Sequence, residues 1–92
     1  VSAASGDEPY QIYCASCHGE KGLGDGVAAG SLNPDPQNLA KNQKQMSDAY
    51  LFWRIAEGGM MEPFKSAMPS WKGILSDEQI WDIVSYIRTL SG

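Results

Sequence analysis

The stretch Cys14-Ala15-Ser16-Cys17-His18, CASCH in one-letter code, contains both cysteines and the only histidine of this 92-residue chain. Such a concentration suits three kinds of site: a disulfide, a metal site, or an attachment point for a covalent cofactor. A structural zinc site normally needs four Cys or His ligands, and the whole chain offers two cysteines and one histidine. A thiol–disulfide active site is expected near a βαβ pattern, which the sequence lacks. Both of these alternatives are therefore weak.

Two interpretations of CASCH remain. A local disulfide across a two-residue spacer would close a very small loop and would stabilise the fold little. Cys-x-x-Cys-His is also the attachment pattern of c-type haem. Its two thiols can bond to the two vinyl groups of one porphyrin edge, and the imidazole that follows can then reach the iron. We therefore expect Cys14 and Cys17 to hold a haem covalently, with His18 as an axial ligand.

The length and charge of the chain narrow the class of protein. We expect residues 1–92 to form a single domain, with a flexible N-terminal segment at residues 1–5. The formal net charge is −4 and no basic run is present, so nucleic acid is not an expected partner. The sequence has no apolar stretch of about 18 residues, so no membrane span is expected. A domain this small is marginally stable alone, and a haem could form the centre of its core.

Capping residues and apolar spacing predict three main helices. The first covers about residues 7–17, with acidic residues and Pro9 in its opening turn. The second covers about residues 47–57, from the N-cap Ser47 to a glycine pair that ends it. The third covers about residues 76–90, because a capping box precedes an apolar stripe at helical spacing.

Two long loops, residues 19–47 and 58–75, separate these helices. The glycines of the first, at positions 19, 22, 24, 26 and 30, are expected mainly to serve turns with positive φ. A structureless loop of this length is uncommon in a compact domain unless it wraps something or carries function. Three helices with so few contacts among them leave a middle that a large cofactor would fill.

In its order of elements, the chain resembles the class I cytochrome c family over nearly its whole length. The matching residues are Gly6 and Tyr10 with Ile83 and Tyr86, the loop Gly22-Leu23-Gly24-Asp25-Gly26 followed by Leu32-Asn33-Pro34, and Met68-Pro69-Ser70-Trp71. By this resemblance, Gly6 and Tyr10 would meet Ile83 and Tyr86 where the first helix crosses the last. The resemblance implies an all-α cytochrome c fold, with three main helices and long loops wrapped around one covalently bound haem c.

A methionine is expected as the second axial ligand of the iron. Met68 is the preferred candidate because Pro69 restricts the residue before it to extended conformations and stiffens the backbone there. The resemblance implies the same Met-Pro ligand. Met61 and Met60 are alternatives, although both follow closely on the end of the second helix, and Met46 is expected to pack beside that helix.

Two further residues are expected beside the haem by resemblance. The carbonyl of Pro34 would accept a hydrogen bond from the proximal imidazole, which would orient the ring and raise its basicity. Pro36 is a close alternative for that role. Trp71 is expected to cover the haem edge, with its indole N–H bonded to a polar partner if it is buried.

Iron with both axial positions filled has no open site for a substrate. The resemblance therefore implies one-electron transfer and not enzymatic catalysis, by a soluble carrier in the periplasm. Its expected partners are a redox protein donor and acceptor, such as a dehydrogenase, a reductase or a terminal oxidase. Electrons would leave near Ala15, Ser16 and the Met60-Met61 region. The alternatives are a cytochrome c domain of a larger redox enzyme and a haem peroxidase or gas-binding protein, which would bind carbon monoxide.

Overall fold

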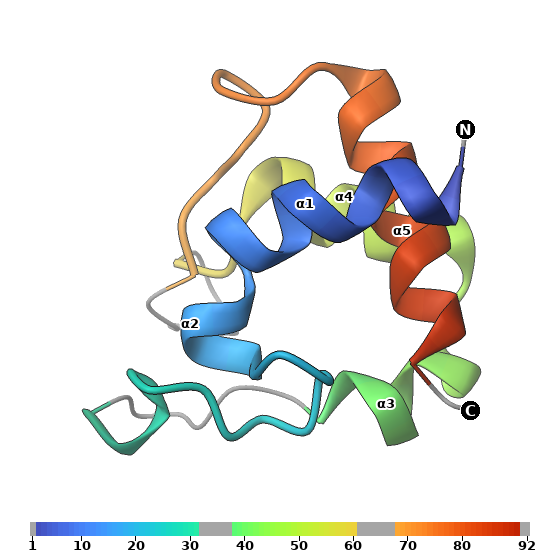
Figure 1. Cartoon of the computed structure of the whole chain (residues 1–92). Coiled ribbons are helices and arrows are strands. Elements are labelled where there is room, and N and C mark those ends of the chain that lie inside the picture. The colour runs from blue at the N-terminus through green and yellow to red at the C-terminus, as the bar shows by residue number, and fades with distance from the viewer. Residues whose placement is uncertain (1, 32–37, 61–67, 91–92) are drawn as a thin grey trace.

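A computed structural model describes residues 2–31, 38–60 and 68–90, and these residues form helices and loops without a strand. Pro34, which is expected beside the haem, its alternative Pro36, and Met61, an alternative ligand to Met68, lie outside the described residues. The described elements, in chain order, are α1 (Ala3–Tyr13), α2 (Ala15–His18), the 3-10 turn η1 (Ala29–Ser31), α3 (Leu39–Asn42), the 3-10 turn η2 (Gln43–Gln45), α4 (Asp48–Glu57) and α5 (Asp77–Thr89) (Figure 1).

The first helix differs from its expected range. Residues 3–5, expected in a flexible segment, form the first turn of α1, and the helix breaks at Cys14 before α2 begins. Ser2 is the N-cap, and its hydroxyl oxygen accepts a hydrogen bond from the N–H of Ser5 at 3.3 Å. The N–H of Ser2 donates to the carboxylate of Asp82 at 2.7 Å. This contact with a distant part of the chain helps to hold the start of α1 in place.

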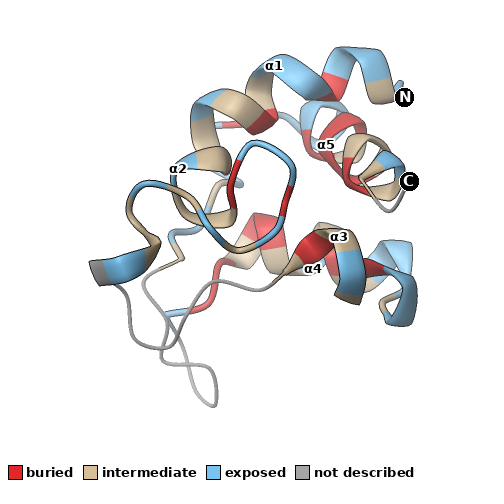
Figure 2. Ribbon diagram, turned by 60° about the horizontal axis from the view of Figure 1, so that its bottom comes forward, coloured by how far each residue is buried: buried red, intermediate tan, exposed pale blue. Residues whose placement is uncertain are grey.

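The expected crossing of the first and last helices is confirmed, and Figure 1 shows α1 lying across α5. A Cβ atom on Gly6 would lie 2.0 Å from the carbonyl oxygen of Asp82 and 2.9 Å from the Cβ of Tyr86. Only a glycine permits this approach. One turn further along, the rings of Tyr10 and Tyr86 lie 5.1 Å apart. Figure 2 shows buried residues on both helices where they meet.

Helices α4 and α5 lie within the ranges that their caps predict. The hydroxyl oxygen of Ser47 accepts from the N–H of Tyr50 at 3.0 Å, and Ser76 forms the predicted capping box with Gln79. The two helices pack through aromatic side chains that include Phe52 on α4 and Trp81 on α5, with ring centroids 4.4 Å apart. The buried apolar core is Tyr10, Cys14, Leu39, Leu51, Ile55, Ala56, Leu75, Ile80, Ile83, Val84 and Ile87.

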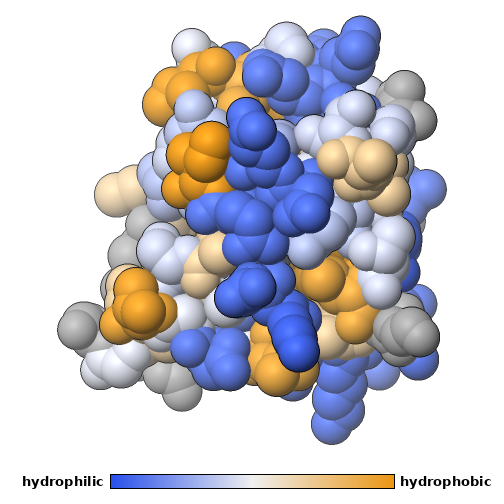
Figure 3. Space-filling view, in the orientation of Figure 1, coloured by the Kyte–Doolittle hydropathy of each residue, from blue (hydrophilic) through white to orange (hydrophobic). Residues whose placement is uncertain are grey.

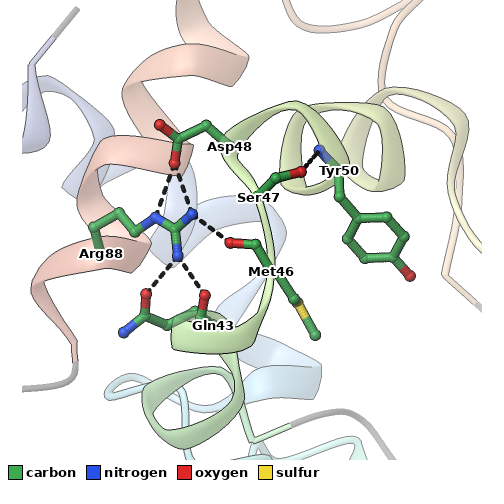
Figure 4. Close-up of polar contacts among 6 residues, drawn as sticks. All are labelled: Gln43, Met46, Ser47, Asp48, Tyr50 and Arg88. Carbon is green, nitrogen blue, oxygen red and sulfur yellow. Dashed lines mark hydrogen bonds and ion pairs between the residues drawn. The ribbon is translucent and has the colours of Figure 1, made fainter.

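The segment between residues 19 and 47, expected to be a loop, contains the short helices η1, α3 and η2. Arg88, near the end of α5, binds this segment where it leads into α4 (Figure 4). Its guanidinium donates to the carbonyl oxygen and the side-chain amide oxygen of Gln43, and to the carbonyl oxygen of Met46 at 2.6 Å. It also pairs with the Asp48 carboxylate at 2.7 Å. These contacts fasten η2 and the start of α4 to α5.

Candidate haem site

The two thiols and the imidazole come from one helical turn. The N–H groups of Cys17 and His18 both donate to the carbonyl oxygen of Cys14, at 3.2 and 3.0 Å. Residues three and four positions apart in a helix lie on the same face. Cys14, Cys17 and His18 are therefore neighbours along one side of this turn. A porphyrin edge with two bonding positions and an iron needs that arrangement of donors.

The two cysteines have different surroundings. Cys14 belongs to the buried core, whereas Cys17 is half-buried, and no disulfide joins these two described residues. Burial raises the pKa of the Cys14 thiol to about 12, since a thiolate is poorly solvated there. The neutral sulfur of a thioether suits this apolar environment better than a thiolate does.

The glycine-rich loop binds the backbone of this turn. The N–H of Gly24 donates to the carbonyl oxygen of His18 at 2.7 Å, and the N–H of Gly26 donates to that of Cys17 at 3.1 Å. The N–H of Ala28 donates to the carbonyl oxygen of Ser16 at 2.8 Å. The last carbonyls of a helix lack partners within it. The loop supplies those partners and so holds the CASCH turn in its helical form.

Three glycines of this loop, Gly19, Gly22 and Gly24, have a positive φ, as the sequence predicts. Gly26 has a different role: a Cβ atom there would lie 2.2 Å from the carbonyl oxygen of Ser16. The absence of a side chain lets the loop reach the turn. The sequence signal for this contact is the glycine pattern itself, although a glycine spacing alone does not distinguish close approach from turn geometry.

Met68 lies on a segment that is bound to the end of α4. Its side chain is half-buried and packs against the core, and its carbonyl oxygen accepts from the N–H of Gly59 at 3.0 Å. Met60 is 69% exposed. Met46 is half-buried against the core, in agreement with its expected packing role. Among the described methionines, Met68 therefore combines partial burial with an anchored backbone on the loop expected to carry the ligand.

Trp71 is half-buried, and its ring packs at a tilt of 55° against that of Tyr13, with centroids 4.9 Å apart. Tyr13 immediately precedes Cys14, and Trp71 follows Met68 by three residues. The ring pair therefore joins the segment that carries the thiols to the segment that carries the methionine. Over the described ranges, no three His, Cys, Asp or Glu side chains form a group that could hold a metal ion.

Helices joined by long loops, with a Cys-x-x-Cys-His turn at the end of the first, define a c-type cytochrome. The chain belongs to the family described as "Cytochrome C oxidase, cbb3-type, subunit III", whose model matches residues 1–87. It is an electron-transfer protein with covalently bound haem c, and not an enzyme. The resemblance to small class I cytochromes drawn from the sequence is confirmed.

Two relatives illustrate different settings for such a domain. Cytochrome c6 of Leptolyngbya boryana is 32% identical over 87 residues, which are 95% of this chain and 91% of that protein. The cytochrome c subunit of the quinone-type alcohol dehydrogenase of Gluconobacter oxydans is 29% identical over 84 residues. These residues are 91% of this chain but 18% of that subunit.

Solved structures confirm the expected cytochrome c fold. A chain of the Kuenenia stuttgartiensis reducing HAO-like protein complex is 28% identical with a TM-score of 0.80, and the match covers 98% of this chain and 43% of that one. The c-type cytochrome KustC0563 has a TM-score of 0.73 at 24% identity, over 95% of this chain and 98% of its own.

Proposed function

We propose that this cytochrome carries single electrons between redox proteins through a haem bonded to Cys14 and Cys17, with His18 and Met68 as the axial ligands. The observation that carries the proposal is the helical turn in which both thiols and the imidazole share one face. The bound haem would supply an iron that alternates between the ferrous and ferric states. We further propose that residues 1–92 form one domain.

The residues of the chain would tune this iron. Methionine is a softer and weaker donor than a second imidazole, so Met68 would favour the ferrous state and raise the reduction potential. The buried core beside Cys14 would act in the same direction, because an apolar environment disfavours the extra charge of ferric iron. Two filled axial positions would exclude substrate, which separates a carrier from a peroxidase or a gas-binding protein.

Trp71 is proposed to shield one edge of the haem. Its contact with the ring of Tyr13, next to Cys14, supports this role because the pair joins the thiol-bearing and methionine-bearing segments. The hydrogen bond from the proximal imidazole to the carbonyl of Pro34 stays a prediction, since Pro34 lies outside the described residues. In a ligating histidine, such a hydrogen bond fixes the orientation of the ring and raises its basicity.

Relatives of this chain include a cytochrome subunit of a dehydrogenase and a chain of a redox complex. We therefore propose redox proteins as partners, with a dehydrogenase, a reductase or a terminal oxidase as the expected classes, and the periplasm as the compartment. No helix in residues 2–31, 38–60 and 68–90 is long and apolar enough to cross a membrane.

The second candidate function is that of a cytochrome domain within a larger redox enzyme. It is favoured by the match to the dehydrogenase subunit, of which this chain covers 18%.

The proposed exit for electrons is the surface near Ser16 and Met60, both of which are exposed.

The face shown in Figure 3 is largely hydrophilic, with apolar side chains in separate groups. A net charge of −4 would steer the protein toward a basic partner surface. Electron transfer to that partner should then slow as ionic strength rises. A rate that is independent of salt would contradict the electrostatic part of the proposal.

The axial ligand is tested with carbon monoxide, which binds ferrous haem only at an open coordination position. The reduced wild-type protein should bind it poorly, whereas Met68→Ala should bind it readily and show a lower reduction potential. Met60→Ala is the matched control and should retain the low-spin visible spectrum, because Met60 is 69% exposed. Tight binding by the wild type would instead favour a gas-binding protein or peroxidase.

A further inference from the structure

The end of α4 is capped by the segment that follows Met68. The last carbonyls of a helix have no partner within the helix. Here the carbonyl oxygen of Ile55 accepts from the N–H of Trp71 at 3.2 Å, and that of Ala56 accepts from the N–H of Lys72 at 3.1 Å. The Ala56 carbonyl also accepts from the hydroxyl of Ser70 at 2.6 Å. Figure 1 shows the two segments side by side.

The glycine pair that ends α4 approaches Met68 itself. Gly58 has a φ of 77°, and a Cβ atom there would lie 2.7 Å from the carbonyl oxygens of Met68 and Pro69. The neighbouring Gly59 donates its N–H to the Met68 carbonyl at 3.0 Å. Both glycines are buried. The backbone of residues 68 and 69 is therefore held by the glycine pair at one point and by the Ser70 hydroxyl immediately after it.

We propose that Ser70, together with the Gly58-Gly59 backbone, is a positioning residue for the axial ligand Met68. The inference rests on the proposed ligation by Met68. A weak donor stays bound more readily when its backbone is already ordered, because ligation then costs less conformational entropy. The hydroxyl of Ser70 fixes the chain two residues beyond the methionine, on a helix end that the core holds in place. Its loss should make the methionine leave the iron more often.

The test is the rate at which carbon monoxide binds the reduced holoprotein, since binding requires Met68 to leave. Ser70→Ala should raise this rate about two- to tenfold, the range that the net free energy of one hydrogen bond gives. Ser70→Thr keeps the hydroxyl and should return the rate to near the wild-type value. In both variants the Ala56 carbonyl still accepts a hydrogen bond from the N–H of Lys72, so it keeps a partner.

Two controls separate ligand positioning from general stability. Ser76→Ala removes a serine hydroxyl that caps α5, and should lower the free energy of unfolding by about 1 kcal/mol without raising the carbon monoxide rate. Lys72→Met removes the exposed ion pair with Glu57, whose shortest N–O distance is 3.1 Å, and should also leave the rate unchanged. The Ser70 proposal is overturned if Ser70→Ala binds carbon monoxide at the wild-type rate, or if Ser76→Ala raises the rate equally.

Met68→Ala, measured in parallel, separates a failure of the proposed ligation by Met68 from a failure of the proposed positioning by Ser70. If Met68→Ala leaves the iron closed to carbon monoxide, the ligand assignment fails and the positioning role of Ser70 fails with it. If Met68→Ala opens the iron while Ser70→Ala behaves as wild type, Met68 stands as the ligand and only the role of Ser70 is wrong.

Discussion

The hydroxyl of Tyr10 donates a buried hydrogen bond of 2.8 Å to the carbonyl oxygen of Gly19, the residue after His18. The sequence marked Tyr10 as a packing residue at the helix crossing, and its ring is indeed fully buried. The hydrogen bond adds a second role. It fastens the first helix to the far end of the CASCH turn, so the helix crossing and the haem-bearing turn are coupled through one side chain.

Tyr10→Phe should lower the free energy of unfolding by about 0.5–1.5 kcal/mol, the net contribution of one hydrogen bond. The Gly19 carbonyl would keep the N–H of Gly22 as a partner, which limits the loss. Chemical denaturation at neutral pH, followed by far-ultraviolet circular dichroism, measures this difference. An unchanged midpoint would show that the hydrogen bond contributes nothing to stability.

The same pair predicts a dependence on alkaline pH. Burial raises the pKa of Tyr10 well above its ordinary value, and the nearby Tyr86 and Asp25 add to this effect. The folded state therefore retains the proton that the unfolded chain releases near pH 10. The stability due to neutral Tyr10 is complete below about pH 10 and falls as pH rises beyond it. Phenylalanine does not titrate, so the advantage of wild type over Tyr10→Phe should shrink from pH 9 to pH 11. A constant difference would contradict this linkage.

Gly6→Ala should destabilise the protein through the crossing of α1 and α5. The new methyl group would lie 2.0 Å from the carbonyl oxygen of Asp82, so the helices must separate. Overpacking of this kind typically costs about 1–3 kcal/mol. Gly30→Ala is the matched control, because a Cβ atom at Gly30 meets nothing within 4 Å. Equal denaturation midpoints for the two variants would show that the crossing tolerates a side chain.

Arg88→Met should release the segment that leads into α4. The substitution keeps much of the aliphatic volume but removes the donors to Gln43 and Met46. Hydrogen bonds that involve a charged group contribute about 1.5–3 kcal/mol each. The substitution should therefore lower the free energy of unfolding by at least the contribution of one such bond. Amide hydrogen exchange should increase selectively in residues 39–48.

Asp48→Asn separates the ion pair from the rest of this cluster. The Asp48 side chain is 67% exposed, and exposed ion pairs contribute about 0–1 kcal/mol. The variant should therefore unfold close to wild type, with a small dependence on salt. If Asp48→Asn destabilised the protein as much as Arg88→Met, the ion pair and not the carbonyl contacts would hold the segment.

Covalent attachment of the haem has a direct chemical test. Acid–acetone extraction of the denatured holoprotein should leave the colour with the polypeptide, because thioether bonds to Cys14 and Cys17 survive unfolding. Mass spectrometry should find the haem mass on the peptide that contains both cysteines. Partition of the colour into the organic phase would contradict attachment.

The ranges of α4 and α5 were predictable because their signals are local. Ser47 and Ser76 cap helices within a few residues of themselves, and the apolar spacing lies inside each helix. The start of α1 also has a local cap in Ser2, which the sequence prediction did not include. The N–H of Ser2 is bound in addition by Asp82, a residue 80 positions away, and this contact forms only in the packed fold. The 3-10 turn η2 and the residue after it, Met46, likewise meet Arg88 across more than 40 positions.

The donors of the site follow from the sequence alone. A spacing of three and four residues places Cys14, Cys17 and His18 on one side of any helical turn, whatever surrounds it. Tertiary structure decided what holds these donors in place. The glycine loop reaches the carbonyls of the CASCH turn, and Ser70 reaches the end of α4. Caps and periodicity act over a few residues of chain, whereas these hydrogen bonds form only after packing brings separate segments within about 3 Å.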